Sequence, residues 1–142
     1  MKTIIFLIIL AFSTFANAQT AVATANGNTA TAKAHYSSNS KSTKTSVSVS
    51  DSDGSYTLRA EFDSWKRAKL QKLLSDNLDK NFLIVRDDTM IWKKENGNET
   101  AYTFALSDEK LKVNIDKELI SKSTFEKFKA LGEKISNLLT EK

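Results

Sequence analysis

The 142-residue sequence contains no cysteine and no proline, and it has a single histidine. Without cysteine the chain can form no disulfide, no thiolate metal site and no lipid-modified cysteine, so its stability must come from apolar packing. The one histidine, His35, lies in a low-complexity stretch, where nothing holds it at a fixed distance from a nucleophile. We therefore assign no catalytic residue, no cofactor-binding residue and no metal ligand, and we expect no cofactor.

The first eighteen residues have the pattern of a cleavable signal peptide. Lys2 precedes an apolar run over residues 4–15, which closes on Ala16-Asn17-Ala18 before Gln19. An apolar run of about a dozen residues is too short for a membrane-spanning helix, which needs roughly 20. We predict cleavage after Ala18 and a secreted or periplasmic protein without stable membrane insertion.

Net charge argues against a nucleic-acid partner. Loss of Lys2 with the signal peptide leaves 20 Lys and Arg against 17 Asp and Glu. Nucleic-acid-binding domains usually concentrate a much stronger basic excess on one face, and export would separate the protein from nucleic acid. The expected partner is a protein or another component of the cell envelope.

Composition divides the rest of the chain in two. Residues 19–45 consist mainly of Ala, Thr, Ser, Asn, Gly and Lys. Such a stretch buries too little apolar surface to offset the entropy of ordering it, so it is predicted to be a disordered linker. Residues 46–142 are long enough for a single domain with its own core.

Hydrophobic periodicity predicts the elements of that domain. Alternation over 46–50 and 56–62, with the turn residues Asp51-Ser52-Asp53-Gly54 between them, predicts a β-hairpin. Four further strands are expected, at residues 82–85, 90–92, 102–106 and 111–115.

Two amphipathic helices complete the expected fold. The first runs from Asp63 or Ser64 to about Asp79, and the second opens with a capping box of Ser123 and Glu126. Alternating strands imply one polar sheet face. The prediction is an α+β fold: a two-layer domain with an antiparallel sheet of about five or six strands and both helices packed on one face.

One candidate binding surface is the polar face of this sheet. The alternating strands place six polar residues on that face: Thr57, Arg59, Glu61, Thr103, Lys112 and Asn114. A face or edge of this kind can receive a partner, although most such faces meet water. Trp65 and Trp92 occupy apolar positions of their elements and are expected in the core or at its rim.

A second candidate is a basic strip on the first helix, formed by Lys66, Arg67, Lys69 and Lys72. It could bind an anionic head group or polysaccharide, but it is also what a solvated helix face looks like.

A third hypothesis is a small carboxylate-dependent hydrolase. Asp87, Asp88, Asp108 and Glu109 would have to converge in a pocket, yet all four lie in predicted turns, where acidic residues are common anyway. The Asp51-x-Asp53-Gly54 fragment resembles the start of a calcium loop, but Phe62 stands where the loop needs a bidentate Glu, so it is interpreted as a turn. The favoured function is a non-enzymatic binding or interaction module.

Overall fold

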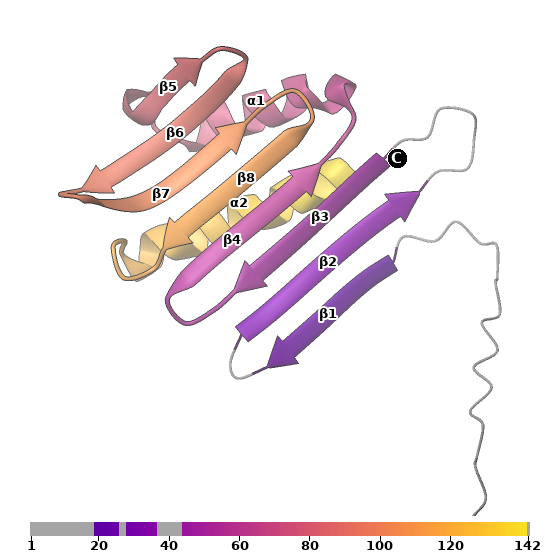
Figure 1. Ribbon diagram of the computed structural model, residues 1–142, viewed down its shortest axis with the longest axis horizontal. Helices are drawn as coiled ribbons and strands as arrows, with labels where there is room; N and C mark the ends of the chain where they lie inside the picture. Colours follow the sequence, from indigo (N-terminus) through magenta and orange to yellow (C-terminus); the bar gives the residue numbers. More distant parts are fainter. Residues whose placement is uncertain (1–18, 26–27, 37–43, 142) are drawn as a thin grey trace, which may run out of the picture.

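The computed structural model describes residues 19–25, 28–36 and 44–141. The predicted signal peptide, residues 1–18, lies outside the described residues. The fold is α+β: one antiparallel sheet and two α-helices, with two short 3₁₀ turns (Figure 1).

The sheet has eight strands in the order β1-β2-β3-β4-β8-β7-β6-β5, and every neighbouring pair is antiparallel. Their bounds are β1 Gln19–Ala25, β2 Asn28–Tyr36, β3 Lys44–Asp51, β4 Ser55–Glu61, β5 Leu83–Arg86, β6 Thr89–Asn96, β7 Glu99–Leu106 and β8 Lys110–Asp116. Six of them, β3 to β8, are the strands that the sequence predicted. The strands β1 and β2 are additional, so the sheet is larger than the predicted five or six strands.

The chain crosses the molecule once. After β4 it leaves the middle of the sheet through α1 (Arg67–Asn77) and arrives at the far edge as β5. Three hairpins then bring β6, β7 and β8 back, and β8 pairs with β4. The closing helix, α2 (Lys122–Thr140), runs diagonally behind the central strands (Figure 1).

Alternation of side chains separates the two faces of the sheet. In β4 the residues Tyr56, Leu58 and Ala60 are buried, and β8 alternates in the same way. Figure 1 shows both helices on the same side of the sheet. Among the described residues no helix lies over the other face.

The core between sheet and helices is apolar and rich in aromatic rings. Phe128 of α2 packs edge-on against Tyr102 and Phe104, with ring centroids 4.9 and 5.3 Å apart. Leu131, Ile135 and Leu139 continue the buried stripe of α2. Edge-to-face pairs add about 0.5–1.5 kcal/mol each beyond the burial of their area.

Gly132 is where α2 comes closest to the sheet. A Cβ at this position would lie 3.6 Å from Leu58 Cδ1, 3.3 Å from Tyr56 Cζ and well inside contact distance of the Tyr56 hydroxyl. The close approach therefore depends on the missing side chain, although glycine costs an α-helix about 1 kcal/mol relative to alanine.

The start of α2 corrects the predicted capping box. The N-cap is Ser121, whose hydroxyl accepts a hydrogen bond from the Thr124 amide at 3.2 Å. Ser123 and Glu126 lie inside the helix, so the capping-box assignment was wrong by two residues. Ser121 satisfies the same requirement, because a hydroxyl there reaches an amide that has no partner within the helix.

The stretch expected to be a disordered linker contains β1 and β2. The two strands pair in unbroken register from Gln19–Ala34 to Ala25–Asn28, and β2 pairs with β3. The expectation considered only how much apolar surface the stretch could bury. Strand addition also satisfies the backbone groups at the edge of β3, and threonine at alternate positions favours extended structure.

Candidate binding surface

The face of the sheet that points away from the helices, here called the open face, gathers the polar residues that the sequence predicted. Thr57 pairs with Asn114, which pairs in turn with Thr103. In the next row Arg59 pairs with Lys112. Directly opposite residues in antiparallel strands share a face, so the register brings these five residues together.

Arg59 and Lys112 place two positive charges side by side in the middle of the open face. Their neighbours in the same row are Ser48 and Ala105, which carry no charge. Within the part of the chain that the structure describes, neither side chain forms an ion pair. Like charges directly opposite each other destabilise a strand pair, so the fold itself gains nothing from this arrangement.

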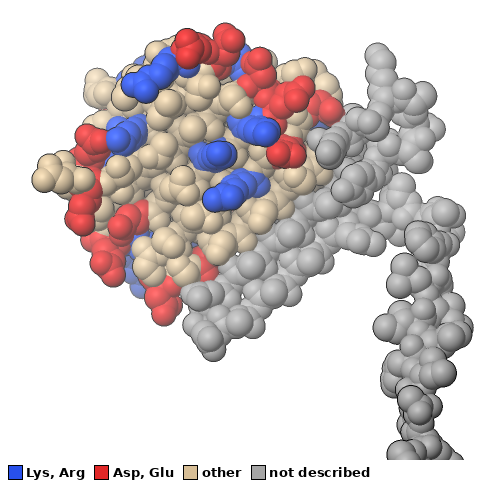
Figure 2. All heavy atoms as spheres, viewed as in Figure 1, with Lys and Arg blue, Asp and Glu red and all other residues tan. Residues whose placement is uncertain are grey.

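A shallow hollow of about 270 Å³ lies over this pair. Ser46 and Ser48 border it with hydroxyl groups, and Glu61 lies beside Lys110 with 3.7 Å between the charged atoms. Figure 2 views the open face: Lys and Arg stand near its centre, and most Asp and Glu lie toward its rim.

A second hollow of about 410 Å³ occupies the same face toward the β3–β4 turn. Its polar lining is mostly hydroxyl and amide groups, from Ser55, Thr57, Thr100, Thr103 and Asn114, with Asp116 also present. The open face thus offers positive charge in one area and neutral hydrogen-bonding groups in the next.

The predicted basic strip on the first helix is divided among separate partners. Arg67 donates from Nη2 to the Asp88 carbonyl at 2.7 Å, and its Nε lies 3.2 Å from Asp108 Oδ1. Lys72 pairs with Asp76 at 2.7 Å. The strip therefore does not form one continuous cationic surface.

Lys66 turns into the protein instead of facing solvent. It is 5 % exposed, and its ammonium donates to the backbone carbonyls of Leu139 and Glu141 at the C-terminal end of α2. These carbonyls carry the partial negative charge of the helix dipole. Burial lowers the pKa of Lys66, although Asp63 and Glu141 act in the opposite direction.

The two tryptophans have opposite environments. Trp92 is 1 % exposed, which confirms the predicted core position, whereas Trp65 is 57 % exposed, so the expectation for Trp65 was wrong. The buried residues on this stretch are Lys66, Leu70, Leu74 and Leu78, spaced four apart. Trp65 precedes that series by one residue in a 3₁₀ turn (Ser64–Lys66) and so points away from the core.

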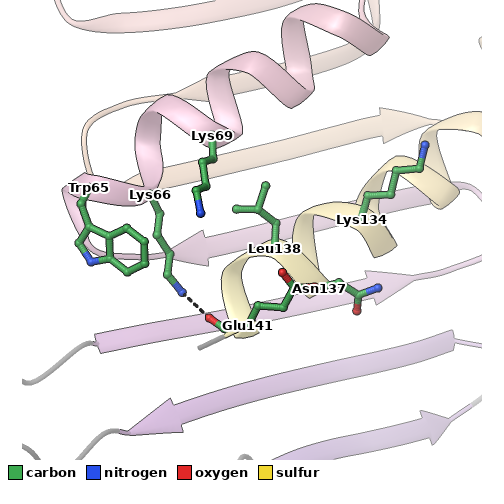
Figure 3. A pocket seen from close by; sticks show the side chains of 7 residues that line it. All are labelled: Trp65, Lys66, Lys69, Lys134, Asn137, Leu138 and Glu141. Carbon is green, nitrogen blue, oxygen red and sulfur yellow. Dashed lines mark hydrogen bonds between the residues drawn. The ribbon is translucent and has the colours of Figure 1, made fainter.

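Trp65 borders a third hollow, of about 390 Å³, between the start of α1 and the end of α2. This Trp65 hollow is lined by Trp65, Lys66, Lys69, Lys134, Asn137, Leu138 and Glu141 (Figure 3). Sequence reasoning missed it because its residues come from two helices far apart in the chain. The spacing of Lys66 from the three leucines was the available signal.

The four carboxylates of the hydrolase hypothesis do not form a pocket. Asp87 and Asp88 lie in the β5–β6 turn, and Asp108 and Glu109 lie in the β7–β8 turn. All four are exposed, and none lines any of the three hollows. Asp87 has a positive φ of 51°, which suits a tight turn.

Asp51 is part of an internal ion cluster. Its carboxylate accepts hydrogen bonds from Lys117 and, at 3.1 Å, from Lys129, and these three residues are here called the Asp51 cluster. Partial burial alone would raise the pKa of Asp51, but the hydrogen bonds and charges of the two lysines outweigh it and hold the pKa below its ordinary value.

The Asp51 cluster bears on the calcium-like fragment. Asp51, Asp53 and Gly54 lie at the β3–β4 hairpin, as the turn interpretation predicted. The first carboxylate of the fragment is already neutralised by two ammonium groups. Among the described residues, no cluster of three or more His, Cys, Asp or Glu side chains has the arrangement of a metal site.

Comparison with known proteins identifies no relative of this chain: no family model, no curated protein and no solved structure matches. In the described part of the chain, neither helix is long and apolar enough to cross a membrane.

Proposed function

We propose that this protein is a non-enzymatic binding module that receives an anionic partner on the open face. In this proposal the domain has two layers, in which amphipathic helices cover one side of the sheet and leave the other side for the partner. A protein or a cell-envelope polymer with a series of negative charges would fit this surface.

The observation that carries the proposal is the Arg59–Lys112 pair. The two cations face each other across β4 and β8 at a cost to the strand pair, and no carboxylate of the described residues neutralises either of them. Lys110, two residues before Lys112, does have an acidic neighbour in Glu61. An anion bound between Arg59 and Lys112 would remove the repulsion that the fold leaves in place.

The two alternatives receive less support from the geometry. The hydrolase hypothesis needs carboxylates that converge in a cleft, and its four candidates are exposed in two turns. The basic-strip hypothesis needs Lys66, Arg67 and Lys72 to face a partner together, and each of them has an intramolecular partner.

Retention on a dextran sulfate column, with dextran sulfate, a sulfated glucan, as the polyanion probe, tests the proposal. The double variant Arg59→Gln/Lys112→Gln should elute at a lower salt concentration than the unchanged protein. The slope of log affinity against log salt should fall by about two, because roughly one counterion is released per contact.

The matched control is Lys122→Gln/Lys127→Gln, which removes two exposed charges from α2 and leaves the open face intact. Its elution should change much less, although its net charge is the same as that of the test variant. Equal shifts for both variants would show that retention reflects net charge alone, and the proposal would fail.

We also propose that the module works outside the cytoplasm, on the strength of the signal-peptide pattern in residues 1–18. Mass spectrometry of the protein purified from its own host should give a mature chain that begins at Gln19. Recovery of a chain that retains Met1 or Lys2 would contradict the proposed export.

A further inference from the structure

The Trp65 hollow has the composition of a ligand site, and it lies on the helix side of the molecule, away from the open face. Figure 3 shows Trp65 at one end of the hollow and Leu138 of α2 across from it, with the Lys69 side chain directed into the space between them. A volume of about 390 Å³ falls within the range of small-ligand pockets, roughly 300–1,000 Å³.

The exposed ring of Trp65 is the first component of the site. More than half of this side chain, 57 %, is open to solvent, which makes it one of the few large apolar side chains on the described surface. The ammonium groups of Lys66 and Lys69 lie 5.2 and 5.9 Å from its ring centroid. These cation–π contacts place positive charge beside the ring.

The second component is positive charge with a fixed direction. Lys66 is anchored on the carbonyls of Leu139 and Glu141, so its charge stays at the inner wall. Lys69 and Lys134 form no ion pair with any residue that the structure describes. Three lysines and one carboxylate, that of Glu141, therefore line the hollow, which favours an anion. Figure 3 shows Lys134 directed away from Trp65, so Lys69 is the lysine that points into the space beside the ring.

The third component is the remaining lining. Leu138 supplies an apolar surface opposite the tryptophan, and the Asn137 amide can both donate and accept hydrogen bonds. An inorganic anion would use only the lysines. The combination of a flat ring, an apolar wall, an amide and ammonium groups suits a ligand with an apolar ring face, hydroxyl groups and a negative charge.

We propose that the Trp65 hollow binds a uronic acid unit, either as a single sugar or within an acidic oligosaccharide. The C–H face of the sugar ring stacks on Trp65 and the carboxylate interacts with Lys69, while the buried Lys66 adds positive charge at the inner wall. In an oligosaccharide, a hydroxyl of the next unit bonds to Asn137, which lies beyond Leu138 in Figure 3. This site does not depend on the anionic partner proposed for the open face.

Intrinsic fluorescence gives a direct test, because the chain has only two tryptophans and Trp92 is buried. Titration of the full mature chain with glucuronate and with a tetrameric glucuronate oligosaccharide should give a saturable change in emission. Glucose supplies the ring without the charge, and acetate supplies the charge without the ring. Neither should produce the change at the same concentration.

Variants then locate the binding. Lys69→Gln keeps the fluorescent ring and should raise the dissociation constant at least fivefold, whereas the matched variant Lys127→Gln should leave it unchanged. Trp65→Phe, followed by calorimetry instead of fluorescence, should weaken binding by at least a similar factor.

Two results distinguish this proposal from the one for the open face. Arg59→Gln/Lys112→Gln should bind the uronate as the unchanged protein does, even if its retention on dextran sulfate, which contains no uronic acid, is lost. Saturation by the oligosaccharide but not by the monomer would identify a polymer as the source. No saturable change with either sugar, an equal response to glucose or acetate, or an unchanged Lys69→Gln would overturn the proposal.

Discussion

The two ends of α2 both carry lysine clusters, and the clusters differ in what balances them. In the Asp51 cluster, toward the start of the helix, two lysines share one carboxylate that is only 19 % exposed. At the end of the helix, Lys66 is balanced by backbone carbonyls, while Lys69 and Lys134 have no carboxylate partner among the described residues. Charges matched inside the molecule stabilise the fold, and the unmatched ones are where we propose that a ligand binds.

The same distinction separates lysines within the sheet. Lys117 joins the Asp51 cluster and also lies over the Phe125 ring, 4.5 Å from its centroid. Lys112 has Arg59 as its neighbour. Lysine content alone, which the sequence shows, cannot separate these roles, because the partner of each lysine is set by the register of the strands and the position of α2.

The largest expected effect comes from displacing the helix that links the two clusters. Gly132→Ala places a methyl group against the Tyr56 hydroxyl and ring, which are buried and cannot move aside without disturbing the sheet. Overpacking of this kind costs up to about 3 kcal/mol, and the better helix propensity of alanine returns about 1. Chemical denaturation should show a net loss of about 2 kcal/mol in the free energy of unfolding.

Two further variants check the cause of that loss. Tyr56→Phe combined with Gly132→Ala removes the closest atom and should recover part of the lost stability. Gly54→Ala is the matched control, because the nearest atom to its new Cβ is Glu118 Oε1 at an ordinary 3.9 Å. Equal losses for Gly54→Ala and Gly132→Ala would mean that the contact with Tyr56 is not responsible.

A smaller effect is expected from breaking the Asp51 cluster with Asp51→Asn. The amide keeps the shape of the carboxylate but leaves two lysines without their counter-charge, which should cost about 1.5 kcal/mol at neutral pH. Because the folded pKa of Asp51 is lowered, its contribution is present above the ordinary value of 3.8 and is lost as pH falls through the folded pKa.

The stability difference between the unchanged protein and Asp51→Asn should therefore shrink when denaturation is repeated at acidic pH. The isosteric variant Asp53→Asn serves as the control, because Asp53 is exposed and takes part in none of the ion pairs described. A difference that stays constant from neutral pH down to about pH 3 would show that the charge of Asp51 is not what matters.

The limits of sequence reasoning follow from the same contacts. Alternation in β4 and β8 was enough to predict the polar face, because side-chain direction in a strand is a local property. The meeting of Arg59 and Lys112 required the pairing of β4 with β8, which is set by the long crossover through α1. The Trp65 hollow required a phase shift of one residue at a 3₁₀ turn together with the position of α2, and neither is a local property.

The edge strands show a different limit. The composition of residues 19–45 was interpreted from the apolar area it could bury, and by that measure it could not fold alone. In the structure β2 is held in an extended conformation by backbone pairing with β3, and β1 is held in the same way by pairing with β2. Hydrogen bonds supplied by a neighbouring edge do not depend on side-chain composition, so composition could not reveal them.

The smallest expected effect is the pH dependence that Lys66, at the C-terminal end of α2, gives to the stability of the protein. Burial lowers the pKa of Lys66, so the unfolded chain binds more protons than the folded one in the interval below the ordinary value of 10.5. Stability from this group must then rise as pH increases through that interval. This change falls on the alkaline side, whereas the loss of stability expected for Asp51 falls on the acid side.

The variant Lys66→Met keeps the length and apolar stem of the side chain. It should change stability at neutral pH by less than about 1 kcal/mol, because the lost hydrogen bonds to Leu139 and Glu141 are offset by the relief of a buried charge. Thermal denaturation between pH 8 and pH 10.5 should show a rise for the unchanged protein relative to Lys66→Met, and Lys127→Met, at an exposed position of α2, should follow the unchanged protein. Parallel curves of stability against pH for all three proteins would mean that the carbonyls of α2 stabilise the Lys66 ammonium as well as water does. The lysines at the two ends of α2 would then differ in their partners but not in how they make stability depend on pH.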